Sequence, residues 1–147
     1  MTMFETVKNN IDKYGWSTLY VHDKKQEKEA FMYSIGFEQA YSHPEIMIFG
    51  LKKEIMHTIL SDLAKSISEG FKVKFDVREQ GVIGNGLDVL FKEVKPKYFD
   101  DYLGTAKKHY QSPFRACVMF WPDKENNLPF NHGYSLKKQR EALEIVS

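Results

Sequence analysis

The apolar side chains of this chain follow two spacings, one helical and one extended. Apolar residues recur every three to four positions over residues 4–14 and again over residues 55–67. This spacing places them on one face of a helix, so it predicts two amphipathic helices. Gly15 and Gly70 follow these two patterns, at the place where glycine commonly ends a helix.

The extended spacing predicts the strands. Runs rich in branched and aromatic residues are bounded by glycine, proline or charged segments, which is typical of strands. These runs cover residues 16–22, 30–36, 45–51, 71–77, 87–94 and 115–121. The run at 45–51 is apolar almost throughout, which favours a central strand that is covered on both faces.

The order of the predicted elements indicates the fold class. A further helix is expected from Pro96 to about His109, because proline is well tolerated in the first helical turn, and Ser135 can cap a short C-terminal helix. The strands are clustered instead of alternating regularly with helices, which indicates an α+β fold. We therefore expect a single domain, residues 1–147, with a mainly antiparallel (mixed) sheet of about six strands and flanking helices.

Composition limits the partners. The chain has 21 basic and 20 acidic side chains, and a net charge of +1 gives no general attraction to nucleic acid or to an anionic membrane. We therefore expect no sequence-specific nucleic acid and no membrane as a partner. Cys117 is the only cysteine, which excludes an intramolecular disulfide and fits a reducing cytosol. Without a signal-peptide core or an apolar run of ~20 residues, a cytoplasmic protein is expected.

Two kinds of site are disfavoured by the spacing of the residues that would form them. Residues 81–86, Gly-Val-Ile-Gly-Asn-Gly, lack the glycine order of a dinucleotide-binding loop and precede a predicted strand. Asn85-Gly86 is instead a strong signal for a hairpin turn. The histidines never form a metal-binding pair such as His-x-x-x-His, and Cys117 has no neighbouring cysteine, so we expect neither a metal nor a cofactor.

His43 and Glu45 form the best polar cluster, in the connection between two predicted strands. The imidazole could exchange a proton near neutral pH, and a carboxylate two residues away could orient it. Alternatively, Pro44 stiffens a turn and Glu45 hydrogen-bonds the turn backbone, as most turn residues do. Both interpretations stay open, so His43 and Glu45 are candidate catalytic residues without an assigned role.

The segment 121–134 is a second candidate region. Trp121, proline and further aromatic residues make it stiff, and such loops can stack a planar ligand such as a nucleobase. Arg115 or Lys124 could then contact an anionic part of that ligand. The same loop can also serve as a hydrophobic plug over the end of a sheet.

Several short segments recur together in a known family. They are Gly15-Trp16, Tyr33-Ser-Ile-Gly36-Phe, His43-Pro-Glu45, Phe49-Gly50-Leu51, residues 102–110, Trp121-Pro-Asp123 and Leu128-Pro129-Phe130. On these segments the chain resembles the bacterial and phage proteins grouped as domain-of-unknown-function family 4262. Ser34 stands where that family usually has threonine, and the strand glutamine often seen before Trp-Pro-Asp is replaced by Val118 or a neighbour. The resemblance implies the fold and the motif positions, and no activity.

From these residues we predict a small-ligand-binding domain without catalytic turnover, and we prefer a nucleotide-derived ligand. The site is expected in a recess between segment 33–45 and segment 121–134, with aromatic walls and directional polar contacts. Its predicted residues are Trp16, Tyr33, Ser34, His43, Glu45, Arg115, Trp121, Asp123 and His132.

Three further hypotheses remain about its role. A phage-type chain of this size could sequester a host signalling nucleotide and so act in counter-defence. A hydrolase or transferase with His43 as general base, oriented by Glu45 or Asp123, is the catalytic alternative, although no nucleophile or metal set can be identified. A protein-interaction module that uses aromatic residues near the C-terminus is the third, and self-association into a homo-oligomer stays open.

Overall fold

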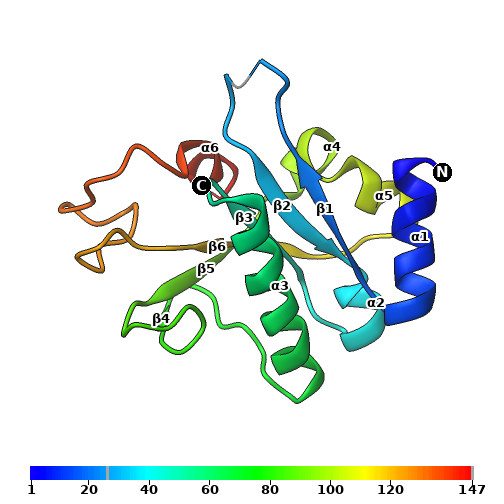
Figure 1. Cartoon of the computed structure of the whole chain (residues 1–147), viewed down its shortest axis with the longest axis horizontal. Coiled ribbons are helices and arrows are strands. Elements are labelled where there is room, and N and C mark those ends of the chain that lie inside the picture. Colours follow the sequence, from blue (N-terminus) through cyan, green and yellow to red (C-terminus); the bar gives the residue numbers. More distant parts are fainter. Residues whose placement is uncertain (26, 147) are drawn as a thin grey trace.

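The computed structural model describes residues 1–25 and 27–146, and these residues contain one mixed sheet. Its six strands lie in the order β1–β2–β3–β6–β5–β4 (Figure 1). They are β1 (Ser17–Val21), β2 (Phe31–Ile35), β3 (Glu45–Phe49), β4 (Arg78–Glu79), β5 (Val89–Glu93) and β6 (Ala116–Phe120). β3 and β6 are parallel, whereas the other neighbours are antiparallel. The predicted α+β class with a mainly antiparallel sheet is confirmed.

Helices cover both faces of this sheet. One face carries α3 (Lys53–Ser68) and the short α2 (Phe37–Tyr41), and Figure 1 places α3 in front of the strands. The other face carries α1 (Met3–Tyr14), η1 (Pro96–Tyr98), α4 (Phe99–Tyr102), α5 (Gly104–Tyr110) and α6 (Arg140–Ile145). Each face buries its own hydrophobic cluster, so the sheet is the middle of three layers.

The contacts of β3 explain why the sequence of this central strand is apolar at successive positions. Ile46 and Ile48 point into the cluster beneath α3, whereas Met47 and Phe49 point into the opposite cluster. All four side chains are fully buried. Successive strand side chains alternate between faces, so a strand covered on both sides requires apolar residues at every position.

Residues 71–77 do not form the predicted strand. Phe71, Val73 and Phe75 do pack against the cluster beneath α3. However, this run contributes only a single bridge between Phe75 and Phe91 among the described residues, and Asp76 takes a left-handed φ of 64°. The edge strand is instead the two-residue β4. The alternation in the sequence indicated which side chains are buried, and it did not indicate strand pairing.

The helix predicted from Pro96 to His109 is divided into three pieces. Leu103, with φ −122° and ψ 35°, separates α4 from α5, and its side chain is fully buried. The break in the helix at Leu103 therefore allows its side chain to pack in the core.

The buried stripe of α3, on the other face of the sheet, begins one residue later than predicted. Ile55 is 44% exposed, and Met56 is the first buried residue of this helix.

The prediction that Ser135 caps the C-terminal helix is wrong. α6 begins at Arg140, with Gln139 before it. Both the N–H and the hydroxyl of Ser135 donate to the carboxylate of Asp123, at 2.9 and 3.1 Å. Ser135 is therefore engaged with a residue twelve positions earlier, which helix-capping rules based on local sequence do not consider.

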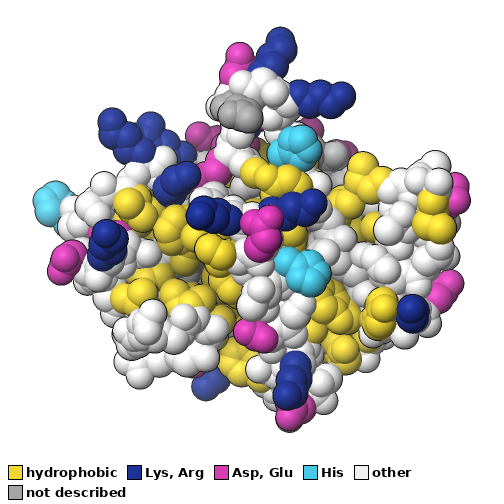
Figure 2. Space-filling model, viewed as in Figure 1, with side chains coloured by type: hydrophobic (Ala, Val, Ile, Leu, Met, Phe, Trp, Pro, Cys, Tyr) yellow, Lys and Arg dark blue, Asp and Glu magenta, His cyan; other side chains and the backbone are white. Residues whose placement is uncertain are grey.

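The surface carries mixed charge. Figure 2 shows the face on which α3 lies, where basic and acidic side chains are interspersed and hydrophobic side chains lie on both sides of the helix. This distribution agrees with the balanced numbers of basic and acidic residues. Within residues 1–25 and 27–146, no helix has the length and apolar character needed to cross a membrane.

Candidate functional site

Glu45, at the start of β3, caps the N-terminus of α2. Its side chain is fully buried, and its carboxylate accepts the backbone N–H groups of Gly36, Phe37 and Glu38 at 3.1 to 3.2 Å. The first turn of a helix leaves such N–H groups without an intrahelical partner. Gly36 has a φ of 120°, and a Cβ there would lie 2.6 Å from the carbonyl oxygen of Gly15, so this turn requires glycine.

Two hydroxyl groups complete the surroundings of this carboxylate. Ser34 donates to Glu45 at 2.7 Å while accepting from the N–H of Ile46 at 3.0 Å, and Tyr110 donates to the other carboxylate oxygen. The pKa of Glu45 is raised to about 7, because burial disfavours its charge more than these hydrogen bonds favour it. We call Glu45, Ser34, Tyr110 and the capped N–H groups of α2 the Glu45 cluster. It joins β2, α2, β3 and α5.

His43 is also buried and hydrogen-bonded. Its Nδ1 lies 2.8 Å from the carbonyl oxygen of Pro44, and its Nε2 lies 3.2 Å from the backbone nitrogen of Val73. This pairing places the proton on Nδ1, so Nε2 accepts from Val73. Burial lowers the pKa of His43 below its ordinary value. The expected contact in which Glu45 orients this imidazole is not formed, since the carboxylate is enclosed by the Glu45 cluster.

Arg115 holds the same short helix from outside. Its guanidinium donates to the carboxylate of Glu38 at 2.7 and 3.1 Å and to the carbonyl oxygen of Ser42 at 2.8 Å. The geometry is bidentate, as expected for a guanidinium with a carboxylate. Arg115 therefore fastens both ends of α2 to the start of β6.

Trp121 and its neighbours lie beyond the C-terminal end of β6. The indole N–H of Trp121 donates to the carbonyl oxygen of Phe49 at 2.7 Å, and the residue is 8% exposed. The side-chain amide of Gln139 bonds both the N–H and the carbonyl oxygen of Trp121, at 3.0 and 2.8 Å. Trp121 is therefore a core residue. The side-chain amide of Gln139 bonds its backbone N–H and carbonyl groups, as the backbone of a neighbouring strand would.

Asp123 organises the loop that follows. One carboxylate oxygen accepts the N–H groups of Glu125 and Asn127, both at 2.9 Å, and the other binds Ser135. His132 lies exposed in the same loop, and its side chain makes no hydrogen bond to the residues that the structure describes. Of this pair, only Asp123 has a structural role that the contacts define.

Within the described residues, the two regions predicted to enclose one recess lie at opposite ends of the parallel strands. Because β3 and β6 run parallel, His43 lies before their N-terminal ends, whereas Trp121 lies beside Phe49 at their C-terminal ends. The six steps along the chain from position 43 to position 49 correspond to about 20 Å of extended chain. Tyr33 does not bridge the two ends, since it is 1% exposed within the core beneath α5. The prediction failed because it did not consider which strands are parallel.

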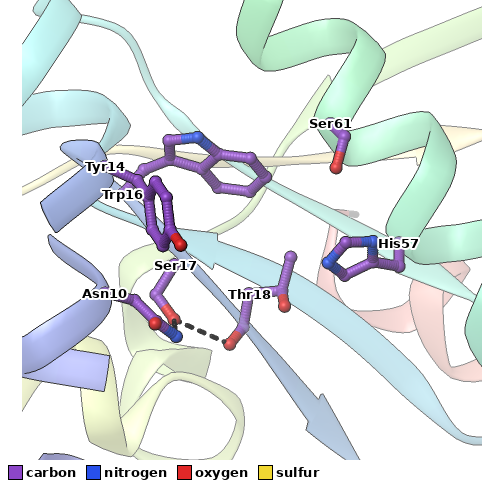
Figure 3. Close-up of a pocket in the computed structure, with 7 residues that line it drawn as sticks. All are labelled: Asn10, Tyr14, Trp16, Ser17, Thr18, His57 and Ser61. Carbon is purple, nitrogen blue, oxygen red and sulfur yellow. Dashed lines mark hydrogen bonds between the residues drawn. The ribbon is translucent and has the colours of Figure 1, made fainter. Parts of the chain in front are cut away.

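A hollow of about 360 Å³ lies elsewhere, at the β1 edge of the sheet (Figure 3). The end of α1 and the residues after it form one wall, β1 forms the floor, and α3 forms the opposite wall. Its lining consists of Asn10, Tyr14, Trp16, Ser17, Thr18, His57 and Ser61. We call this the Trp16 hollow.

Local sequence explains both walls of the Trp16 hollow. Gly15, with a φ of 89°, ends α1 and directs the chain into β1, so that Tyr14 and Trp16 flank the turn. Trp16 is held by packing on Phe37, with ring centroids 5.3 Å apart. On α3, His57 and Ser61 are four residues apart and therefore share one face of the helix.

The polar groups of the hollow differ from those of the Glu45 cluster. The side chains of Trp16, Thr18, His57 and Ser61 make no hydrogen bond to other residues among positions 1–25 and 27–146. In Figure 3 the indole and the imidazole lie on opposite sides of the hollow. These donors and acceptors are therefore available to water or to a ligand.

Trp16 is the one predicted site residue among those that line this hollow. Sequence reasoning did not name Asn10, Thr18, His57 or Ser61 as site residues, and His57 is an exposed residue. The available signal was weak: His57 and Ser61 are polar positions one turn apart beside the apolar stripe of α3. It would not have indicated β1 as the facing element.

Comparison with known proteins gives one match. A family model described as "Domain of unknown function (DUF4262)" matches residues 10–135, which include the Glu45 cluster and the lining of the Trp16 hollow. Neither the curated proteins nor the solved structures contain a match.

Proposed function

The chain belongs to the DUF4262 family, whose description states no activity, and we propose that it binds a small planar molecule in the Trp16 hollow. One observation carries this proposal: an aromatic wall faces the side chains of Thr18, His57 and Ser61, which have no hydrogen-bonding partner among the described residues, whereas Asn10 and Ser17 bond each other. Ligand sites commonly combine apolar or aromatic walls with a few directional polar groups. In this arrangement the indole of Trp16 would contact the ligand's ring, and His57 and Ser61 would contact its edge.

A nucleotide-derived ligand is the class we prefer. A nucleobase has a flat face for an aromatic side chain and hydrogen-bonding groups along its edge. The volume of about 360 Å³ is near the lower end of the range that small-molecule pockets occupy, so it suits a ring system with one substituent. Sequestration of a signalling molecule, as in phage counter-defence, would require such binding and no turnover.

The positions of the catalytic candidates support binding over turnover. Both ring nitrogens of His43 are hydrogen-bonded inside the fold, and Glu45 is fully enclosed. A general base must reach the proton that it removes from the substrate. Using His43 in this way would first require breaking its bond to Val73.

The test is calorimetric titration of the full chain with nucleobases, nucleosides and nucleotides, followed by analysis of the recovered ligand. We expect at least one to bind and to be recovered unchanged. Loss of one aromatic stacking partner costs about 1–3 kcal/mol, so Trp16→Ala should weaken binding by about 5- to 150-fold. Recovery of an altered product would contradict binding without turnover.

A second variant separates loss of binding from loss of fold. Trp16 packs on Phe37, so its truncation also removes core contacts. Ser61→Phe adds a ring from the partly exposed face of α3 and should fill the hollow without disturbing that packing. His132→Ala, in an exposed loop, is the matched control and should bind like the wild type. Unchanged affinity in both Trp16→Ala and Ser61→Phe would overturn this site.

A further inference from the structure

The lining of the Trp16 hollow carries no Lys, Arg, Asp or Glu among the described residues. From this we infer that the hollow selects uncharged bases or nucleosides over phosphorylated nucleotides, an inference that rests on the proposed function. Phosphate sites in proteins usually present cationic side chains or the N-terminus of a helix. The lining of the hollow presents no lysine, no arginine and no N-terminus of a helix among the described residues.

The helix at the rim has the wrong polarity for an anion. α1 ends at Tyr14, so its C-terminal end, with the partial negative charge of unpaired carbonyl groups, faces this side of the molecule. The N–H of Gly15 satisfies one of these carbonyl groups by bonding the oxygen of Ile11 at 2.8 Å. The remaining partial negative charge repels a phosphate group, whereas it exerts no net repulsion on a neutral ligand.

Two lysines lie near residues of this site. Lys53, on α3 four residues before His57, has its ammonium 5.2 Å from the centroid of the Tyr20 ring. Lys13 lies beside Tyr14, which lines the hollow. Its ammonium lies 5.3 Å from the centroid of the Tyr14 ring. It is exposed, and an exposed lysine contributes little to binding an ion because water screens the interaction. Lys13→Ala therefore tests whether a lysine beside a lining residue contributes to binding.

The polar lining also matches the edge of a base. The amide of Asn10, the hydroxyls of Thr18 and Ser61, and the imidazole of His57 can each donate or accept a hydrogen bond. The edges of nucleobases combine donors and acceptors, whereas a phosphate group at neutral pH mainly accepts. Side chains that both donate and accept therefore suit the edge of a nucleobase and give no special preference for a phosphate group.

The experiment is calorimetric titration of the full chain with adenosine, guanosine, cytidine and uridine, and with the 5′-monophosphate of each, at low and at high NaCl concentration. We expect the best nucleoside to bind at least tenfold more tightly than its monophosphate, with little dependence on salt. A monophosphate that binds as tightly as its nucleoside, or an affinity that falls steeply with salt, would overturn the inference.

Three variants identify the groups responsible. His57→Ala and Ser61→Ala should each lower nucleoside affinity by about threefold to tenfold, whereas Lys13→Ala should leave it unchanged. If Lys13→Ala weakens monophosphate binding and Trp16→Ala abolishes it, the hollow is a ligand site but it recognises phosphate, and only this inference fails. If no base, nucleoside or monophosphate binds, the proposed function fails as well.

Discussion

The Glu45 cluster and the Trp16 hollow contain similar side chains, but the partners of these side chains differ. In the cluster, a carboxylate and two hydroxyls bond one another and the backbone of α2. In the hollow, an imidazole, an indole N–H and two hydroxyls have no hydrogen-bonding partner among the described residues. Buried polar groups in proteins are nearly always hydrogen-bonded, whereas exposed ones can exchange water for a ligand. The partners of a polar residue therefore indicate its role better than its type does.

This difference predicts where substitutions will act. Removing a member of the Glu45 cluster leaves buried donors or acceptors unpaired, and the loss appears as reduced stability. Removing a polar group from the hollow leaves only a change in hydration, so stability should hardly change and binding should fall. The two regions can therefore be distinguished by measuring stability and affinity in the same variants.

The largest effect is expected for Glu45→Ala. The variant leaves the capped N–H groups of α2 and the hydroxyls of Ser34 and Tyr110 without their acceptor. We expect a loss of about 3–5 kcal/mol in the free energy of unfolding, measured with urea. Glu125→Ala, at an exposed position, is the control and should change it by less than about 0.5 kcal/mol. A loss below about 1 kcal/mol in Glu45→Ala would show that the cluster contributes little.

The pH dependence of the free energy of unfolding should show that the carboxylate of Glu45 is buried. Because the pKa of Glu45 is raised to about 7 from an ordinary value of 4.5, the folded chain binds a proton that the unfolded chain releases between these values. The contribution of Glu45 to stability should therefore fall by about 2–3 kcal/mol as pH rises from 4.5 to above 7. His43 has a lowered pKa and acts oppositely, so its contribution is lost as pH falls below 6.5.

Carbon NMR of the Glu45 side chain separates these two contributions. Its carboxyl resonance should titrate near pH 7 in the folded chain. The variant Glu45→Gln should lack the corresponding fall in stability while keeping that of His43. Titration of the Glu45 carboxyl at or below pH 4.5 would mean that the hydrogen bonds outweigh burial.

A smaller loss is expected for Tyr110→Phe. This change removes one hydroxyl donor from Glu45 and keeps the ring that packs on Phe114, with centroids 4.9 Å apart. We expect a loss of about 1.5–3 kcal/mol in the free energy of unfolding, since hydrogen bonds to charged groups contribute about that much. Tyr98→Phe, whose hydroxyl makes no hydrogen bond within the described residues, is the matched control. Equal stability of the two variants would contradict the role of Tyr110.

The smallest effect on stability is expected in the hollow. His57→Ala and Ser61→Ala should each change the free energy of unfolding by less than about 0.5 kcal/mol, because their polar atoms have no partner within the described chain to lose. A loss above about 1 kcal/mol in either variant would indicate an unrecognised structural contact. The hollow would then resemble the Glu45 cluster and not contrast with it.

Local patterns were sufficient for much of the fold. The periodicity of residues 4–14 and 55–67 predicted α1 and α3, and the apolar run at 45–51 predicted the central β3. The short α2 was missed because its N-terminus is capped by Glu45, seven to nine residues later in the chain. Its stability therefore comes from a contact that a local pattern does not contain.

The candidate site was harder to predict, because it depends on which strand ends meet. His43 and Trp121 have the expected chemistry, but the parallel pairing of β3 with β6 separates them. The facing positions of Thr18 and His57 come from β1 and α3, which are about forty residues apart in sequence. Nothing in the spacing of either residue indicates the other.

The central claim, that the Trp16 hollow and not the Glu45 cluster meets a ligand, is tested most directly by NMR. The full chain labelled with nitrogen-15 would be titrated with the nucleoside that binds best. We predict that backbone amide shifts change at Asn10, Thr18 and His57, and that those of Ile46, which bonds Ser34 of the Glu45 cluster, and Val73 stay constant. Changes confined to Ile46, Val73 or the loop at 121–134 would contradict the account.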